Sequence, residues 1–462
     1  MEIAEKSEPT NQSGEQRELG SEPIGKLFPK YTIPAIFSGL FFGVQVIFDG
    51  MFLGNGVGPE ALTTIAILFP YFVLITALSN LFGNGGASIC AVEVGKGNKE
   101  KAKKILGQSI AFSLAITLTM SIISFLLLPF ILNGLGARGE IVDMAMEFMK
   151  VYLIFFPFMT TGYTLFYFAR ADERPLLALL ALFIPPVLAI LTEYILIFKL
   201  QYGIVSSAIA VSIELGPSFL LIFYFLFGRT DLRLNLSDFR MRLYDFLRIA
   251  KVGFPSCAIQ LTTFFSVIIV NNILAYAGAN SYEVGAYGIN NAYIYYVLLI
   301  VGYSFGIGIQ PIVSYNFGNK SFDRVKSALK YGCIWGFGIM TLILIACIVF
   351  IEPLAGTFCG GDSACVGPTK IITQKFTMGL SIATVAMVIS YYYQALEKTG
   401  RAVLIVVSRK VFLFPLIFVF FKAMGVDGIW YAFPLAEVST CFVAMTMIRK
   451  DLRKLRIVNV VA

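Results

Sequence analysis

The chain has 462 residues, of which 57% are hydrophobic and 14% are charged, with a mean hydropathy of +0.79 and a formal net charge of +8. A water-soluble core does not need so much apolar sequence, so the composition indicates a protein that spans a membrane. Histidine is absent, which excludes a Ser-His-Asp triad and imidazole metal ligands and argues against an enzyme.

Twelve apolar stretches follow a polar N-terminal segment. Residues 1–29 lack the apolar region of a signal peptide, so we expect them to form a disordered cytoplasmic tail. A helix needs roughly 20 apolar residues to cross the hydrocarbon layer. We therefore predict an all-α membrane protein with twelve transmembrane helices near 31–54, 62–90, 107–133, 141–168, 175–199, 203–228, 250–277, 284–314, 326–352, 366–395, 402–422 and 427–448.

The second six stretches repeat the first six at an offset of about 222 residues. The clearest match sets Phe82-Gly83-x-Gly85 through Gly95 against Phe305-Gly306-x-Gly308 through Gly318, a shift of 223. Because six is an even number of crossings, both copies enter the membrane in the same sense. We therefore expect two six-helix lobes related by a pseudo-twofold axis along the membrane normal. The predicted divisions are an N-lobe at 30–228, a cytoplasmic linker at 229–249, a C-lobe at 250–448 and a basic cytoplasmic tail at 449–462.

The basic residues predict the orientation. With the N-terminus inside, about 28 of the 36 Lys and Arg residues fall on the cytoplasmic side, as the positive-inside rule requires. We expect a multi-pass protein of the plasma (inner) membrane with both termini cytoplasmic. The charge is then a topology signal, and no nucleic-acid partner is expected.

Two of the seven cysteines lie in a predicted outer loop. Cys359 and Cys365 fall between the ninth and tenth spans, on the oxidising side, and two alternatives stay open: a short disulfide or two free thiols. The cysteines show no metal-site spacing, so neither a metal nor another cofactor is expected.

Acidic residues inside the predicted spans are the main candidates for function, because ionised groups are costly in hydrocarbon. Asp49 and Glu193 fall at similar depths in the outer half, Glu214 lies nearer the midplane, and Glu437 is interpreted as structural. Each could instead be a structural carboxylate satisfied by hydroxyls or an ion pair. Asp49 also ends a polar stripe with Ser38 and Gln45, at helical spacing.

Aromatic residues are candidates for the substrate surface. The eighth span is rich in polar and aromatic side chains, including Asn290, Tyr293 and Tyr296, and Phe42 shares the face of the first span with Gln45. Tyrosine faces hold organic cations with about 0.5–2 kcal/mol each. Packing between helices is the alternative role.

Several motifs together resemble the multidrug and toxic compound extrusion (MATE) family, in particular its DinF-like and MepA-like prokaryotic branch. They are Phe48-Asp49-Gly50-x-Phe52-Leu53-Gly54, Gly58-Pro59-Glu60-Ala61-Leu62, Gly136-Ala137-Arg138-Gly139-Glu140 and Tyr315-Asn316-Phe317-Gly318-Asn319. The resemblance implies an efflux pump whose two lobes alternate between inward-open and outward-open states and exchange organic cations for H+ or Na+.

The resemblance also implies roles for individual residues. Asp49 and Glu193 stand where that branch has its N-lobe acids, whereas Ala189 and Val211 replace an Asn and a Thr that usually assist. Glu214, one turn from Val211, is a candidate to compensate. Because a sodium site depends on such oxygen donors, we favour H+ over Na+ as the coupling ion, with drug and proton competing for the same negative charge.

The expected function is therefore a cation-coupled multidrug efflux antiporter that works as a monomer in the lipid bilayer on small-molecule drugs or organic cations. The alternative is a flippase for lipid-linked saccharides of related architecture. Such a flippase is expected to place basic residues in its cleft, whereas the N-lobe here carries acids.

Overall fold

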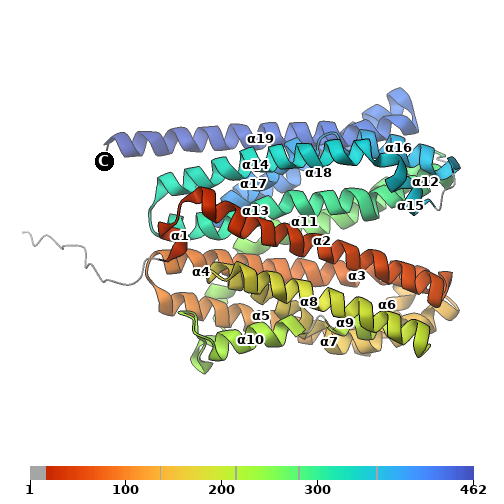
Figure 1. Ribbon diagram of the computed structural model, residues 1–462, viewed down its shortest axis with the longest axis horizontal. Coiled ribbons are helices and arrows are strands. Elements are labelled where there is room, and N and C mark those ends of the chain that lie inside the picture. Colours follow the sequence, from red (N-terminus) through yellow and green to blue (C-terminus); the bar gives the residue numbers. More distant parts are fainter. Residues whose placement is uncertain (1–16, 136, 214–215, 279–280, 360–362, 462) are drawn as a thin grey trace, which may run out of the picture.

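The computed structural model describes residues 17–135, 137–213, 216–278, 281–359 and 363–461, and every regular element among them is helical. The helices run alongside one another in an elongated bundle, and helix α1 and the C-terminal end of the chain lie at the same end of it (Figure 1). The predicted all-α class is confirmed.

The first half of the chain forms the N-lobe. Its helical elements are α1 (Glu18–Ser21), α2 (Ile24–Gly56), α3 (Pro59–Ser79), η1 (Asn80–Asn84), α4 (Gly85–Gly95), α5 (Lys99–Leu126), α6 (Leu128–Gly134), α7 (Glu140–Ala171), α8 (Pro175–Tyr194), η2 (Ile195–Lys199), α9 (Val205–Ser212) and α10 (Gly216–Phe227).

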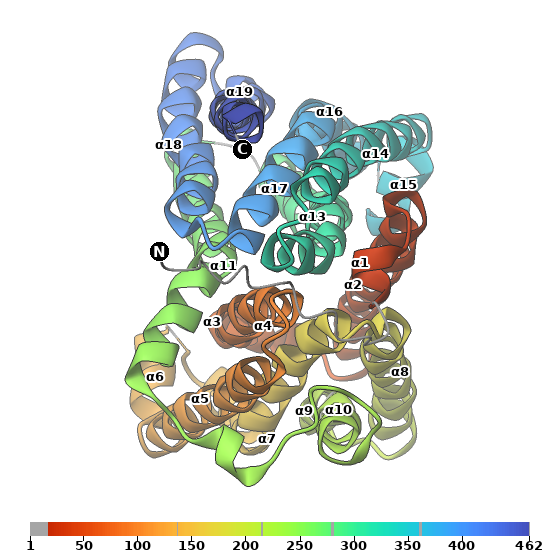
Figure 2. The same cartoon turned by 90° about the vertical axis from the view of Figure 1, so that its left-hand side faces the viewer.

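The second half forms the C-lobe. The short element η4 (Leu236–Phe239), which precedes it, packs on α5 of the N-lobe. The helical elements of the C-lobe are α11 (Leu243–Tyr276), α12 (Ser281–Ile289), η5 (Asn290–Ile294), α13 (Tyr295–Gly318), α14 (Phe322–Val349), α15 (Ile351–Phe358), α16 (Ser363–Thr377), α17 (Leu380–Ala395), α18 (Thr399–Met424) and α19 (Val426–Val461). Viewed along the bundle, the two lobes lie one above the other (Figure 2).

Each predicted span coincides with one long helix or with a run of helical segments. Within the described residues, nine helices are long and apolar enough to cross a membrane, or ten if the bent pair α16 and α17 counts as one crossing. The remaining two crossings are α7, whose first turns are charged, and the interrupted run of α9 and α10. These two segments do not combine the length and the hydropathy of the other ten, but both pack within the N-lobe.

The helices extend beyond the predicted apolar stretches at three places, and at the first of them the expected disorder is wrong. Residues 17–29, expected to be disordered, form α1 and the start of α2. Helix α11 begins at Leu243, inside the predicted linker, and α19 continues through the predicted basic tail. Helical hydrogen bonding does not end where the hydrocarbon layer ends, so hydropathy sets the span but not the helix end.

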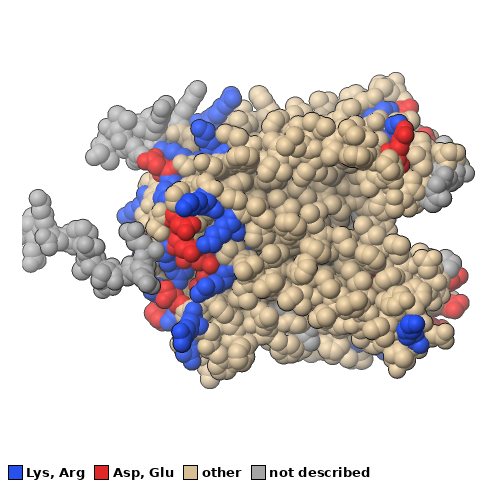
Figure 3. Space-filling model, viewed as in Figure 1, with Lys and Arg blue, Asp and Glu red and all other residues tan. Residues whose placement is uncertain are grey.

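Charged side chains gather at one end of the bundle, which we call the charged end (Figure 3). The middle of the visible surface carries almost none, and few appear at the opposite end. At that opposite end the surface is indented between the two lobes (Figure 3). The uncharged middle is the part that a bilayer would cover.

Glycines let the lobes touch through their backbones near the charged end. A Cβ on Gly95, the last residue of α4, would lie 2.1 Å from the carbonyl oxygen of Tyr315 in α13. A Cβ on Gly318, the last residue of α13, would lie 2.1 Å from the carbonyl oxygen of Val92 in α4. The two contacts are equivalent under the 223-residue repeat, so α4 and α13 meet around the pseudo-twofold axis.

Polar side chains reinforce this seam between the lobes. Gln310 of α13 donates a hydrogen bond from Nε2 to Ser88 Oγ of α4 at 2.6 Å. Arg248 of α11 pairs with Glu93 of α4 at 3.2 Å and with Glu397 at 2.7 Å. The seam is therefore closed at the charged end.

A short N-terminal segment, residues 17–22, spans the same seam, and we call it the N-terminal strap. Leu19 is fully buried, its N–H donates to Glu173 Oε1 of the N-lobe at 2.8 Å, and its carbonyl accepts hydrogen bonds from Asn316 and Arg324 of the C-lobe. Burial raises the pKa of Glu173. The backbone of the buried Leu19 is thus hydrogen bonded to both lobes.

A disulfide links Cys359 and Cys365, whose Cα atoms are 5.7 Å apart. It joins the end of α15 to the first turn of α16. The bonded state in the cell remains a prediction, tested below.

Candidate functional site

The two N-lobe acids predicted to act together lie side by side. Asp49 comes from α2 and Glu193 from α8, and their carboxyl groups are within hydrogen-bonding reach of each other. Ser207 of α9 donates a hydrogen bond from Oγ to Asp49 Oδ1. Glu193 is 2% exposed, and its Oε1 has no hydrogen-bond partner among the described residues. The three side chains form a small polar cluster where α2, α8 and α9 meet.

The local sequence explains why Asp49 points inward. Ser38 and Gln45, the other members of its polar stripe, are 3% and 6% exposed. Apolar side chains on α2, including Phe37 and Met51, are about half exposed, at 49% and 53%. Helix α2 thus turns its polar stripe toward the protein and apolar side chains toward the bilayer.

A central cavity of about 210 Å³ lies between the lobes. Its wall is rich in aromatic rings and small polar groups, and none of the described residues that line it carries a formal charge. The lining residues include Ser38, Gly39, Asn80, Tyr163, Tyr167, Pro185, Gln260, Tyr296, Tyr303 and Tyr391. Apolar walls with a few polar groups are typical of small-molecule sites.

The predicted substrate residues occupy different environments. Tyr296 lines the central cavity. Asn290 is buried within the C-lobe and donates to Thr373 Oγ1 at 2.8 Å, and Tyr293 stacks on Phe358 with ring centroids 5.1 Å apart. Gln45 is buried in the N-lobe and does not line the cavity.

Two predicted residues cannot be placed in the same way. Glu214 lies outside the described residues, and the side chain of Phe42 does too.

Asp49 and Glu193 are not part of the wall of the central cavity. The acid pair in the N-lobe is therefore separate from the cavity between the lobes in this conformation.

Comparisons with known proteins decide the family. The profile of the MatE family matches residues 34–195 and 255–419, one segment in each lobe and together more than half of the chain. The chain belongs to the MATE family. It is therefore a membrane transporter, and the resemblance noted in the sequence is confirmed.

Similar proteins support the same assignment over nearly the full length. The multidrug export protein MepA of Staphylococcus saprophyticus is 25% identical over 427 residues, which cover 90% of this chain and 92% of the relative. A crystal structure of a MATE protein in complex with MaL6 aligns with a TM-score of 0.90 at 21% identity, covering 95% and 98% of the two chains. An outward-facing multidrug resistance MATE transporter also aligns with a TM-score of 0.90, at 20% identity and 96% and 99% coverage. The predicted twelve-helix, two-lobe fold is confirmed.

Two positions of this MATE chain lack the oxygen donors that the family pattern implies, and the structure shows what surrounds them. Ala189 is buried in α8, one turn before Glu193. Val211 lies in α9, one turn after Ser207. Ser207 therefore lies on the same face of α9 as Val211, and its hydroxyl reaches Asp49. Sequence reasoning missed Ser207, although its spacing of four from Val211 was a usable signal.

Sequence reasoning also missed a charged cluster in the C-lobe of this MATE transporter. Arg409 of α18 forms a buried ion pair with Glu437 of α19, and the Tyr295 hydroxyl is hydrogen bonded to both. The pair fits the structural role predicted for Glu437. Two consecutive basic residues, Arg409 and Lys410, in the middle of an apolar span were the signal that could have found it.

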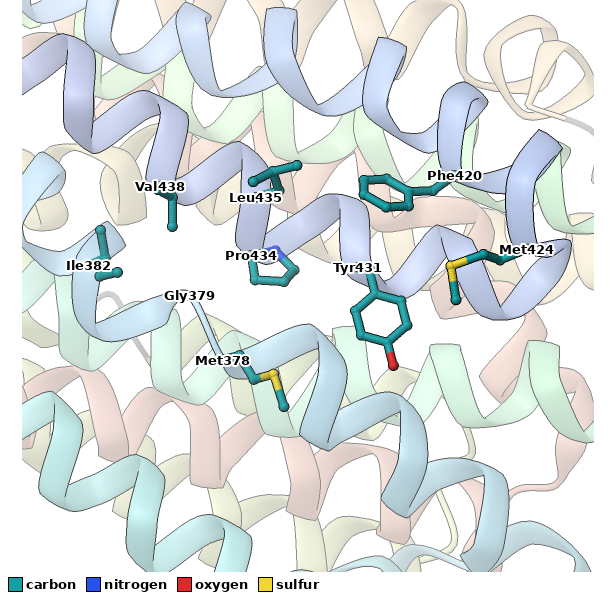
Figure 4. A pocket seen from close by; sticks show the side chains of 9 residues that line it. All are labelled: Met378, Gly379, Ile382, Phe420, Met424, Tyr431, Pro434, Leu435 and Val438. Atoms are coloured by element: carbon teal, nitrogen blue, oxygen red, sulfur yellow. The ribbon is translucent and has the colours of Figure 1, made fainter.

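A larger pocket of about 510 Å³ lies on the C-lobe around the break between α16 and α17 (Figure 4). Its wall is apolar apart from the Tyr431 hydroxyl, and Met378, Met424 and Val438 are each substantially exposed. It lacks the convergent polar groups that orient a ligand. In a bilayer such a surface is covered by acyl chains, so we assign it no role in transport.

Proposed function

We propose that this MATE transporter is a proton-coupled multidrug efflux antiporter that exports amphipathic organic cations. The observation that carries the proposal is the contact of the buried Glu193 with the partly buried Asp49. The MepA relative is named a multidrug export protein, which supports the substrate class.

The acid pair is suited to exchanging a proton. Two carboxylates in contact repel each other when both are ionised, and a proton held between them removes that repulsion. Gain or loss of that proton changes the charge buried between α2, α8 and α9. The packing of these three helices then depends on the protonation state.

Helix α2 links the pair to the central cavity. Ser38 and Gly39 of α2 line the cavity, and Asp49 lies ten residues further along, which is about 15 Å at the helical rise. Because the acids do not line the cavity in this conformation, coupling through α2 replaces the direct competition between drug and proton that the sequence suggested. A shift of α2 would alter the cavity wall when the pair changes its charge.

The cavity suits a cationic amphipath. The rings of Tyr296, Tyr303 and Tyr391 line it, and aromatic faces attract cations with about 0.5–2 kcal/mol each. No charged side chain among the described residues lines it. A pyrophosphate-bearing lipid calls for basic groups in the wall, so the flippase alternative is not favoured.

The coupling ion is proposed to be H+. Asp49, Glu193 and Ser207 are the oxygen donors seen together, whereas hard metal cations take several oxygen ligands at fixed distances. Ala189 and Val211 offer no side-chain oxygen. Three oxygen-bearing side chains suffice for a proton shared between carboxylates.

The charged end is proposed to face the cytoplasm, because Lys and Arg are retained on that side. The seam at that end is closed and the opposite end is indented, so the conformation is outward-open. We further propose that the transporter works as a monomer in the plasma (inner) membrane, with both termini cytoplasmic.

Asp49→Asn tests the proposal, since it removes the titrating charge and keeps the shape. Proteoliposomes with a pH gradient and no Na+ should exchange a fluorescent organic cation when they contain the wild type and should not when they contain Asp49→Asn. Glu193→Gln should shift the pH dependence of exchange. Asp143→Asn, at an exposed position of α7, is the matched control and should behave as wild type.

Full exchange by a correctly inserted Asp49→Asn protein would refute the role of the pair. Exchange that requires a sodium gradient would instead assign Na+ as the coupling ion.

A further inference from the structure

A second, smaller cavity of about 30 Å³ lies inside the C-lobe. Four residues line both this cavity and the central cavity, so the two share a wall: Ile259, Thr263, Tyr303 and Tyr391. If a compound in the central cavity extends a substituent past this shared wall into the C-lobe, the substituent enters this space. We call it the C-lobe cavity.

Three charged side chains line the C-lobe cavity: Arg409, Lys410 and Glu437. The Arg409 guanidinium forms an ion pair with Glu437 and lies 3.4 Å from the Tyr303 hydroxyl. Glu437 is therefore already paired, and Arg409 is already neutralised.

Lys410 is left without such a partner. Among the described residues it makes no ion pair and no side-chain hydrogen bond, and Glu437 is the one carboxylate in the wall of the C-lobe cavity. Lys410 is half-buried, and the Glu437 carboxylate that acts on it is shared with the nearer guanidinium of Arg409. An ammonium with so little compensation in a low-dielectric environment is costly. Such intramembrane charges are typically paired or face a substrate pathway.

A second polar group points to the same space. Thr440 of α19 is 3% exposed and lines the C-lobe cavity, and its Oγ1 has no hydrogen-bond partner among the described residues. Buried hydroxyls are normally satisfied, so an orphan one in the wall that also contains Lys410 indicates a missing hydrogen-bond partner. An ammonium and a hydroxyl together supply the donors that a carboxylate accepts.

We propose that the C-lobe cavity is an anion subsite that holds the carboxylate of a transported amphipath, with Lys410 as counter-charge and Thr440 as hydrogen-bond donor. A single water needs about 10–15 Å³ of such space, so the cavity fits a group about the size of a carboxylate. The aromatic body of the compound lies in the central cavity. This rests on the proposed function and adds zwitterionic compounds to the organic cations of its substrate class.

A matched pair of dyes tests the subsite: a xanthene dye with a free carboxylate and the methyl ester of the same dye. Binding to the purified, full-length protein is measured by fluorescence polarisation, and transport is measured in proteoliposomes. Lys410→Met should weaken binding of the free-carboxylate dye by about tenfold or more, the scale of one lost charged hydrogen bond, and leave the ester unchanged. Lys410→Arg should retain most of the affinity.

Lys422→Met is the matched control, because it removes a cation from an exposed position of the same helix α18. It should change the binding of neither dye. Thr440→Val keeps the shape of the side chain and removes its hydroxyl, so it should weaken binding of the free-carboxylate dye and leave binding of the ester unchanged. This variant decides the question if Lys410→Met does not fold.

Equal losses for both dyes, or no loss for either, would overturn the subsite. If the wild type binds the dyes but transports neither, the proposed efflux function fails while the binding comparison still decides the subsite. If the protein transports the ester, and the variants bind the free-carboxylate dye as tightly as the wild type does, the subsite is refuted and the proposed function stands.

Discussion

Gly318→Ala should shift the transporter away from the conformation described here. The new Cβ would lie 2.1 Å from the carbonyl oxygen of Val92, and both sides of the contact are backbone, so no side-chain rotation relieves it. An ordinary contact begins at 3.4 Å, at least 1.3 Å more than this, which requires the lobes to part at the charged end. Overpacking of this kind costs about 1–3 kcal/mol, equivalent to a change of about 5- to 150-fold in the ratio of the two conformations.

Repeat symmetry sharpens this expectation. Gly95→Ala creates the equivalent contact from the other lobe, also at 2.1 Å, and should have a similar effect. Gly338→Ala is the matched control, because a Cβ at Gly338 in α14 meets nothing within 4 Å. Alanine stabilises a helix interior by roughly 0.5–1 kcal/mol relative to glycine, so helix propensity alone predicts no loss in any of the three.

The assay is the distance between spin labels on opposite lobes at the charged end. Glu100 and Asp323 are repeat-equivalent, with side chains 71% and 91% exposed, and cysteines at these positions in a cysteine-free background accept the labels. Electron–electron resonance should show a larger population at long distance in Gly318→Ala and Gly95→Ala than in wild type. Unchanged distance distributions in both variants, or the same shift in Gly338→Ala, would refute the reasoning.

Three further predictions follow from local contacts. Ser207→Ala removes the hydrogen bond to Asp49 and should weaken proton coupling without abolishing it, seen as a shifted pH profile of exchange; an unchanged profile would assign Ser207 to packing. Leu19→Ala empties a fully buried position, which typically costs about 2–5 kcal/mol, so the strap should become accessible to limited proteolysis while the bundle stays intact; equal protection would contradict its docking role. Alkylation of the unreduced protein should modify neither Cys359 nor Cys365, and reduction should expose both to the reagent in a mass measurement; labelling of both before reduction would show two free thiols.

The sequence by itself determined the number of crossings, the two-lobe repeat and the inward face of α2. Each of these depends on the local chain: span length follows from apolar runs, the repeat from a fixed offset, and the polar stripe of Ser38, Gln45 and Asp49 from helical spacing. The membrane makes such patterns unusually decisive, because a backbone in lipid must satisfy its own hydrogen bonds and therefore forms helices.

Only the tertiary structure decided which side chains meet. The contact of Asp49 with Glu193 brings together residues 144 positions apart, and Ser207 joins them from a third helix. The pairing of Arg409 with Glu437, which leaves Lys410 without an ion pair of its own, likewise depends on how α18 and α19 rotate against each other. Hydropathy fixes which face of a helix avoids lipid, but the partner opposite each polar group depends on rotation and depth within the bundle, which helix packing sets.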